Sequence, residues 1–387
     1  MRKSFVLALT VVMVIFMVGI SSVTFAGKDT AKPYVVGAFV SVTGPNSTLG
    51  TPERDTLKMI EARINKNGGI NGHPLKVIIE DDASDNTNAV KAANKLVNQD
   101  NVCALIGGSG TGPSLAVAPI AENNEVAQIS MAAGLMITNP VKKWVFRVAI
   151  TDSIIAGKML SYLAQQKLDK LAIIYDSNAY GTSGRDQLRS LASKYKITIV
   201  SEEAFASNDT DMTVQLTKIR TTNAKAIVCW GTNPGPAQVA KNHQQLGINI
   251  PLFMSHGMAN QTFLDQAGAA ADGIILPAEK LVAANQLPGS DRQKKVLLQF
   301  GKDYQQLYKT PADQYAGHAW DALNIVSEAL RKVGDNRAKL RDQIEKTKDF
   351  VGIAGIFNFS ADDHDGVTSD ACVMLKVKDG KWTLLKK

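Results

Sequence analysis

Short apolar runs alternate with longer amphipathic stretches from Pro33 to the end of the chain. The runs are rich in Val, Ile and Leu, which is typical of buried strands, and between them apolar residues recur at helical spacing. The pattern predicts strands at 34–40, 75–81, 102–107, 126–130, 171–176, 197–201, 225–230, 251–254, 273–276, 356–359 and 371–377. It predicts helices near 51–67, 86–99, 113–124, 153–167, 181–195, 210–222, 235–246, 289–308, 315–333 and 337–347.

This alternation predicts an α/β fold in which parallel strands are covered by helices on both faces. The predicted strands outnumber those of a usual single sheet, so we expect two doubly wound parallel-sheet lobes. In such sheets ligands bind beyond the carboxyl ends of the strands. The loops that follow the strands are therefore the expected carriers of function.

Two of these loops resemble each other. In 104–113 (ALIGGSGTGP) and in 227–236 (IVCWGTNPGP) a buried strand breaks at glycines and a helix starts on a proline, which is favoured at the first helical position. Such a turn points free backbone N–H groups and the positive end of a helix dipole into the crevice, which suits a carboxylate or a phosphate. Glycines that only close a tight turn are the alternative, which the repetition weakens. A ligand touching both loops would lie between the lobes.

Motifs for enzymes, cofactors and metals are missing. The chain has no phosphate-binding G-x-x-x-x-G-K-[ST], no G-x-G-x-x-G, no G-x-S-x-G and no H-E-x-x-H, so we expect no cofactor and no metal. The acidic run 362–366 (DDHDG) lacks the alternating ligands of a calcium loop and is expected to be a solvated turn. Cys103, Cys229 and Cys372 lie inside apolar runs without metal or redox spacing, which predicts buried free thiols.

Composition and charge exclude further classes. The chain has 387 residues, 45% of them hydrophobic and 20% charged, which is ordinary for a globular protein of two or three domains. The net charge of +7 is spread out, with no run of five or more Lys or Arg. We therefore expect no nucleic-acid partner.

Residues 1–26 have the form of a secretory signal peptide. Two basic residues precede an apolar stretch that ends at Ile20, and small residues follow up to Ala26. We expect cleavage after Ala26 and a soluble, exported mature protein. An uncleaved anchor helix is the weaker alternative, because the apolar stretch is shorter than the roughly 20 residues that a membrane span requires.

Several short motifs, taken in their order and spacing, resemble the periplasmic solute-binding proteins of branched-chain amino acid (Leu/Ile/Val) type importers. The resemblance covers essentially all of 33–387. The motifs are Gly37-Ala38-Phe39 with Thr43-Gly44-Pro45, Asn67-Gly68-Gly69-Ile70-Asn71-Gly72, Glu80-Asp81-Asp82, Leu105-Ile106-Gly107-Gly108, Ala118-Pro119-Ile120-Ala121-Glu122, Tyr175-Asp176 with Tyr180-Gly181, and Gly355-Ile356-Phe357-Asn358-Phe359.

The resemblance implies two α/β lobes joined by three crossovers, which close around a ligand by hinge motion. It places 33–151 and 281–357 in the first lobe, and 152–280 and 358–387 in the second. It also implies a monomeric, non-enzymatic periplasmic protein that hands its ligand to a membrane permease of an ABC importer.

The resemblance also implies a ligand-binding site. The ligand carboxylate is expected at two loops, Ser109-Gly110-Thr111 and Ala132-Ala133-Gly134, with Thr111 donating a hydroxyl. Gly134 stands where the family commonly has Thr or Ser, so one hydroxyl donor is lost. From the second lobe Tyr180 is expected to close the cleft. Further contacts are expected from Tyr315 and from Asn233, which replaces an aromatic residue of leucine-type members.

One departure concerns the ligand's ammonium group. Amino-acid binders of this family place an acid just after the strand that matches 252–254, but the segment 255–260 (SHGMAN) contains none. Burying an unpaired ammonium costs several kcal/mol or more. His256, and His318 on a later helix, are instead suited to a second polar or anionic group. The chain here looks more like members that take up aromatic carboxylates.

The leading hypothesis is therefore a binding protein for a small apolar or aromatic carboxylate. The first alternative is a branched-chain amino acid binder of the same family, with the ammonium held by neutral acceptors such as Asn233. A sensor ectodomain and an exported hydrolase are further alternatives. The first is weakened by the absence of a second membrane segment, and the second by the missing nucleophile motif.

Overall fold

The computed structural model describes residues 31–232 and 234–385. The predicted signal peptide 1–26 and the site residue Asn233 lie outside the described residues, so both stay predictions. Within the described part of the chain, no helix is both long and apolar enough to cross a membrane.

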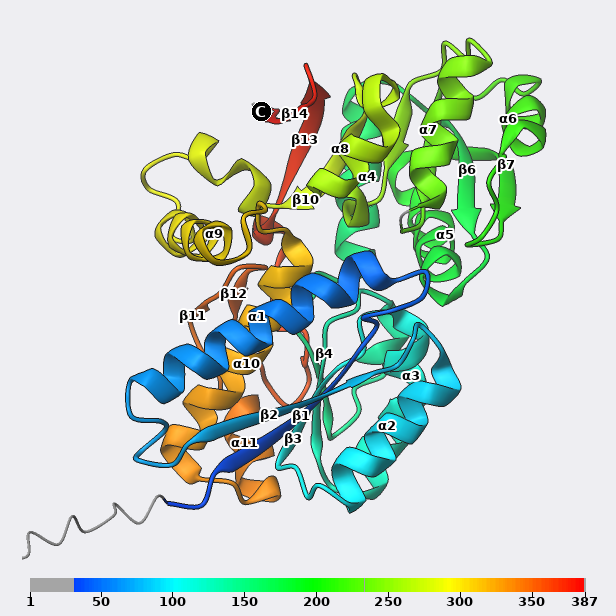
Figure 1. Ribbon diagram of the computed structural model, residues 1–387. Helices are drawn as coiled ribbons and strands as arrows, with labels where there is room; N and C mark the ends of the chain where they lie inside the picture. Colours follow the sequence, from blue (N-terminus) through cyan, green and yellow to red (C-terminus); the bar gives the residue numbers. More distant parts are fainter. Residues whose placement is uncertain (1–30, 233, 386–387) are drawn as a thin grey trace, which may run out of the picture.

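The first sheet has five parallel strands in the order β2-β1-β3-β4-β5 (Figure 1). Its strands are β1 (Tyr34–Val40), β2 (Leu75–Asp81), β3 (Ala104–Gly107), β4 (Ala127–Ser130) and β5 (Val145–Arg147). Its helices are α1 (Ser47–Lys66), α2 (Asn86–Asn98), α3 (Thr111–Asn123), α10 (Gln314–Val333) and α11 (Arg337–Glu345). The helices α1 and α10 pack on each other, as do α2 and α3, so both faces of the sheet are covered.

The second sheet has seven strands in the order β14-β13-β10-β9-β8-β6-β7. The parallel strands are β6 (Lys170–Asp176), β7 (Thr198–Phe205), β8 (Ala226–Trp230), β9 (Leu252–Met254) and β10 (Ile275–Glu279). The antiparallel edge is formed by β13 (Cys372–Lys378) and β14 (Lys381–Leu384). The helices of this half are α4 (Asp152–Gln165), α5 (Ala179–Ala192), α6 (Thr213–Arg220), α7 (Gly235–Gln245) and α8 (Gln261–Ala267).

Two further elements belong to neither of these sheets. The helix α9 (Lys294–Tyr308) packs beside α10, where Phe300 and Tyr304 join one apolar cluster with Ala316. A two-stranded hairpin of β11 (Phe350–Val351) and β12 (Ile356–Phe357) stands apart from both sheets.

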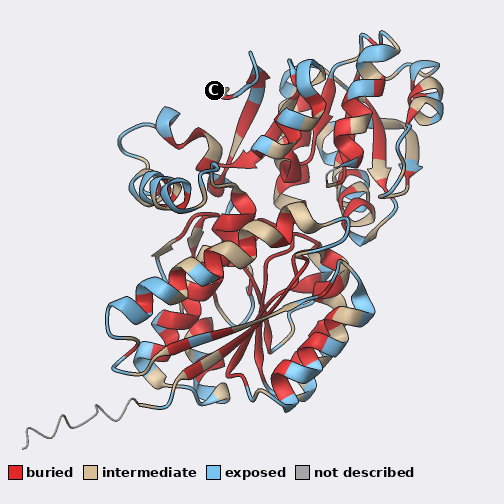
Figure 2. Ribbon diagram, in the orientation of Figure 1, coloured by how far each residue is buried: buried red, intermediate tan, exposed pale blue. Residues whose placement is uncertain are grey.

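Burial follows from helices covering both faces of each sheet. Every residue of β3 and of β8 is buried, and Figure 2 shows the inner strands as the buried centre of each half, with exposed positions on the edge strands and the outer helices. The cysteines Cys103, Cys229 and Cys372 are buried and free, which confirms that prediction.

The expected alternation of strand and helix is confirmed, with four elements missed. The strands β5, β11 and β14 and the helix α8 have between two and seven residues, so a periodicity spanning several turns does not detect them. The strand expected at 356–359 is also shorter, because Ile356–Phe357 pairs only with Phe350–Val351.

The lobe boundaries stay a prediction. One set of contacts bears on the last boundary, which the sequence placed after residue 357. The backbone N–H of Arg147, at the end of β5, donates to the carbonyl of His364 at 3.0 Å. The His364 ring stacks on Phe146 with centroids 4.0 Å apart. We therefore propose that the third crossover follows Gly366 instead of residue 357.

A candidate ligand-binding cleft

A cleft of about 500 Å³ lies where loops from both sheets meet. Its described lining comes from the segments that follow each of the strands β1 to β9 and from the start of α10. The cleft therefore lies at the carboxyl ends of the strands, where the sequence predicted a ligand site. The lining residues are Pro45, Asn46, Leu49, Ser84, Asp85, Asn86, Thr87, Ser109, Gly110, Thr111, Gly112, Pro113, Met131, Ala132, Ala133, Ala149, Asn178, Ala179, Tyr180, Ser207, Thr232, His256, Gly257, Gln314, Tyr315 and His318.

The start of α3 forms one wall of the cleft. Gly110 is the N-cap residue and Thr111 the first helical residue, so the first N–H groups of α3 have no carbonyl partner within the helix. The Thr111 hydroxyl is buried, with the residue 3% exposed, and has no hydrogen-bond partner. A helix start with an open hydroxyl is suited to hold a carboxylate.

The Ser109 hydroxyl is already engaged by the framework. It accepts the backbone N–H of Ser41 at 2.9 Å and donates to the carboxyl group of Glu53. Glu53 is buried, and this burial raises its pKa well above the usual range, which favours the neutral acid. The Ser109 hydroxyl therefore holds the loop in place, since both of its hydrogen bonds are made within the protein.

The loop 132–134 forms the next part of this wall. Ala132 and Ala133 line the cleft, whereas Gly134 does not. A Cβ on Gly134 would come within 2.3 Å of Cγ2 of Thr111, so only glycine leaves Thr111 its position here. Gly134 thus removes one hydroxyl donor from the expected site, but it also leaves room for the second donor, Thr111.

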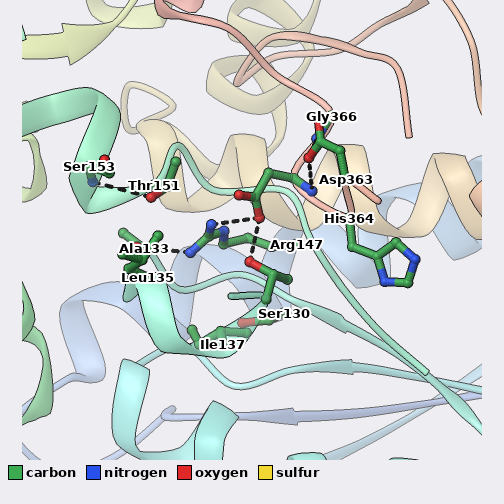
Figure 3. A network of polar contacts seen from close by, with 12 residues as sticks. Ser130, Ala133, Leu135, Ile137, Arg147, Thr151, Ser153, Asp363, His364 and Gly366 are labelled. Atoms are coloured by element: carbon green, nitrogen blue, oxygen red, sulfur yellow. Dashed lines mark hydrogen bonds and ion pairs between the residues drawn. The ribbon is translucent and has the colours of Figure 1, made fainter. Parts of the chain in front are cut away.

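Arg147 holds this loop from behind (Figure 3). Its Nη1 donates to the carbonyl oxygens of Ala133 at 3.0 Å and Gly134 at 2.8 Å, and its Nη2 pairs with the Asp365 carboxylate at 2.6 Å. Thr138 donates to the same carboxylate at 2.5 Å. The expected solvated turn at 362–366 is therefore wrong in part, since Asp365 is anchored to this arginine.

The second sheet contributes aromatic and imidazole side chains. The Tyr180 hydroxyl lies 3.3 Å from Nδ1 of His256, and the Tyr180 ring packs 6.2 Å from that of Trp230. Burial lowers the pKa of His256 to about 3, with a smaller contribution from the neighbouring His318, so His256 is neutral at pH 7. This wall therefore presents an aromatic surface and neutral hydrogen-bonding groups.

The start of α10 closes a third side of the cleft. Tyr315 donates its hydroxyl to the carbonyl of Gly257 at 2.9 Å, and Nε2 of His318 lies 2.7 Å from the Glu279 carboxylate. Gln314 also lines the cleft here, although sequence reasoning missed it. Its spacing of four residues from His318 on one helix face is the signal that points to it.

Acidic side chains are nearly absent from the lining. Asp85 is the one acid among the described lining residues, and it already caps α2 by accepting the N–H of Asn88 at 2.9 Å. None of these lining residues is a Lys or an Arg. Across residues 31–232 and 234–385, no three His, Cys, Asp or Glu side chains are grouped to hold a metal ion.

The structure brings most of the predicted site residues together. Those that line this one cleft are Ser109, Gly110, Thr111, Ala132, Ala133, Tyr180, His256, Tyr315 and His318. Asn233 lies outside the described residues, but its neighbour Thr232 lines the cleft and lies 3.5 Å from Asn46 of the opposite half. Contact of these residues with a ligand stays a prediction.

Comparison with known proteins identifies the family. A model of the periplasmic binding protein family matches residues 33–381, and this chain belongs to that family. A Leu-, Ile-, Val-, Thr- and Ala-binding protein of Pseudomonas aeruginosa is 26% identical over 322 residues, covering 82% of each chain. A Leu/Ile/Val-binding protein homologue of Brucella melitensis is 24% identical and covers 94% of this chain and 97% of its own.

Solved structures show the same two-sheet architecture. An extracellular ligand-binding receptor of Rhodopseudomonas palustris is 28% identical, with a TM-score of 0.85, and covers 91% of this chain and 99% of its own. A branched-chain amino acid transporter substrate-binding protein of Streptococcus pneumoniae, in complex with isoleucine, is 26% identical with a TM-score of 0.80. That match covers 92% of this chain and all of the other. The chain therefore has the α/β fold of the type I periplasmic binding proteins.

Proposed function

We propose that this protein is the periplasmic substrate-binding component of a branched-chain-amino-acid-type ABC importer and captures a small apolar or aromatic monocarboxylate. Thr111 carries the proposal, because its buried hydroxyl is open at the start of α3. A carboxylate bound there would gain the hydroxyl, backbone N–H groups and the helix dipole. The signal-like segment 1–26 and the family support export and delivery to a membrane permease.

The rest of the cleft supports an apolar or aromatic ligand body. Leu49, Met131 and Ala149 line it together with the ring of Tyr180. The ligand would lie between these side chains while its carboxylate faces α3. Binding and release without chemical change is the role that family membership favours.

A branched-chain amino acid is the second candidate ligand. The Pseudomonas relative is named as a binder of leucine, isoleucine and valine, and the Streptococcus structure contains isoleucine. Against it stands the lining, in which Asp85 is the one described acid and already caps a helix. An ammonium group would therefore rely on neutral acceptors, at a cost of several kcal/mol.

A thermal-shift panel on the purified mature protein tests the proposal. Benzoate, 3-phenylpropanoate and 4-methylpentanoate should each raise Tm by an amount that grows with the logarithm of ligand concentration over Kd, and leucine should raise it less at the same concentration. Recovered ligand should be chemically unchanged after prolonged incubation. A large shift with leucine and none with the acids would contradict the proposed ligand class, and turnover would contradict the binding role.

A further inference from the structure

The start of α10 places open hydrogen-bonding atoms in the cleft. Gln314 is 2% exposed, and neither its amide oxygen nor its amide nitrogen has a hydrogen-bond partner. His318 is also 2% exposed, and its Nδ1 has no partner although Nε2 is engaged. Both residues line the cleft and lie four positions apart, on one face of the helix.

Such atoms are costly to bury in a protein without a partner. A buried, unpaired amide or imidazole nitrogen has lost its hydrogen bonds to water without replacement, so native proteins rarely leave several such atoms together. The adjacent Tyr315 donates its hydroxyl proton to the carbonyl of Gly257, so it has no proton left for the amide oxygen of Gln314. Gln314 and His318 thus form a polar patch separate from the helix start that holds Thr111.

The charges around this patch limit what it can bind. Glu279 lies behind His318 at 2.7 Å, and Asp313 caps α10 one residue before Gln314. No Lys or Arg is among the described residues of the lining, so a second carboxylate on the ligand would meet acids and no compensating cation. A neutral group that both donates and accepts hydrogen bonds avoids this cost.

We infer that the cleft selects monocarboxylic acids that carry a hydroxyl group, and that Gln314 and His318 bind this hydroxyl. Nδ1 of His318 and the ligand hydroxyl form one hydrogen bond, in which the imidazole nitrogen accepts or donates according to its tautomer, while Nε2 contacts Glu279. The amide nitrogen of Gln314 then donates to the hydroxyl oxygen. The inference rests on the proposed function, because it assumes that the ligand's carboxylate lies at Thr111.

Matched ligand pairs test this selectivity on the unaltered protein. Calorimetry would compare benzoate with 4-hydroxybenzoate, and 3-phenylpropanoate with 3-(4-hydroxyphenyl)propanoate, so that each pair differs by one hydroxyl. In at least one pair the hydroxylated acid should bind tighter by about tenfold or more. Benzene-1,4-dicarboxylate, which places a second charge at the same position as the hydroxyl of 4-hydroxybenzoate, should bind more weakly than that acid.

Variants then assign the effect to the patch. In Gln314→Met, which keeps the side-chain length but removes the amide, the affinity ratio within the responsive pair should fall toward one. The matched control is Gln305→Met, an exposed position on α9, which should keep the wild-type ratio. A His318→Phe variant provides a second measurement if Gln314→Met does not fold.

The outcomes separate this inference from the proposed function. If the acids bind but neither hydroxylated acid binds tighter than its partner, the hydroxyl inference is wrong and the carboxylate-binding function stands. An unchanged ratio in Gln314→Met and in His318→Phe would also overturn it. If no acid binds and leucine does, both the inference and the proposed ligand class fail.

Discussion

The two halves of the molecule line the cleft in different ways. The first-sheet wall, formed by residues 109–113 and 131–133, presents backbone groups and, apart from Met131, small side chains, and buried polar residues hold it from behind. The second-sheet wall, formed by 178–180, 232 and 256–257, presents the ring of Tyr180 and the neutral imidazole of His256. Preorganised backbone N–H groups are suited to bind a charged group, whereas large side chains are suited to pack against the ligand body. We propose that the first wall anchors the ligand's carboxylate and that the second wall recognises the shape of the ligand body.

The largest expected effect comes from removing the support of the first-sheet wall. Arg147→Met deletes the partner of two carbonyl groups and of Asp365 from a fully buried position. Loss of one member of a buried pair costs about 3–5 kcal/mol, so the free energy of unfolding measured in urea should fall by about that amount. Arg189→Met, which removes an exposed pair with Glu202, is the control and should cost less than about 1 kcal/mol. Equal losses in both variants would contradict the supporting role.

Thr111 tests anchoring directly. A hydrogen bond to a charged group contributes about 1.5–3 kcal/mol, so Thr111→Ala should weaken binding of a carboxylate about ten- to a hundredfold by calorimetry. Thr111→Ser keeps the hydroxyl and is the matched control, with a smaller loss expected. Wild-type affinity in the Ala variant would remove Thr111 from the site.

Tyr180 tests selection by the second-sheet wall. Its ring supplies contact area that exists only when the two halves hold the ligand between them, so Tyr180→Ala should speed ligand release more than it slows capture. Tyr180→Phe keeps the ring and should have a milder effect. Stopped-flow kinetics measures both rates. A defect confined to the capture rate would argue against this division of roles.

The smallest expected effect is on the pH dependence of stability. The pKa of His256 is lowered by burial to about 3, so the folded protein binds fewer protons at this site than the unfolded chain, whose His pKa is about 6.5. The contribution of the neutral His256 to the free energy of unfolding is fully present above pH 6.5 and is lost as pH falls toward 3. Between pH 7.5 and 5.5 the wild type should lose about 1 kcal/mol through this group, and His256→Gln should lose less. If the free energies of unfolding of the two proteins change with pH in parallel, the lowered pKa of His256 is contradicted.

Much of the fold and of the first-sheet wall could be predicted from the sequence. Buried strands and amphipathic helices have distinct periods, and parallel strands direct their following loops to one edge. The repeated glycine-proline loops therefore pointed to the segment 104–113 as an anion-binding helix start, and the family resemblance pointed to Thr111 within it. The family resemblance then brought in Tyr180, Tyr315 and the histidines.

The missed features depend on contacts between distant segments. Arg147 meets Asp365 only because the chain returns from the second sheet to β5, and no local pattern encodes that return. Gln314 looks like an ordinary polar residue at a helix start, and its importance arises from a burial that leaves its amide without a partner. The strand β5 has three residues, too few to show a period.

The most direct test of the account compares leucine with 4-methylpentanoate, which differs from it only by lacking the ammonium group. Calorimetric titration of the mature protein with each would measure what the cleft gains or loses from that one charge. The account predicts that 4-methylpentanoate binds at least about tenfold more tightly, because the described lining residues offer the carboxylate a helix start but the ammonium no free acid. Tighter binding of leucine would contradict it and would make the protein an amino acid binder.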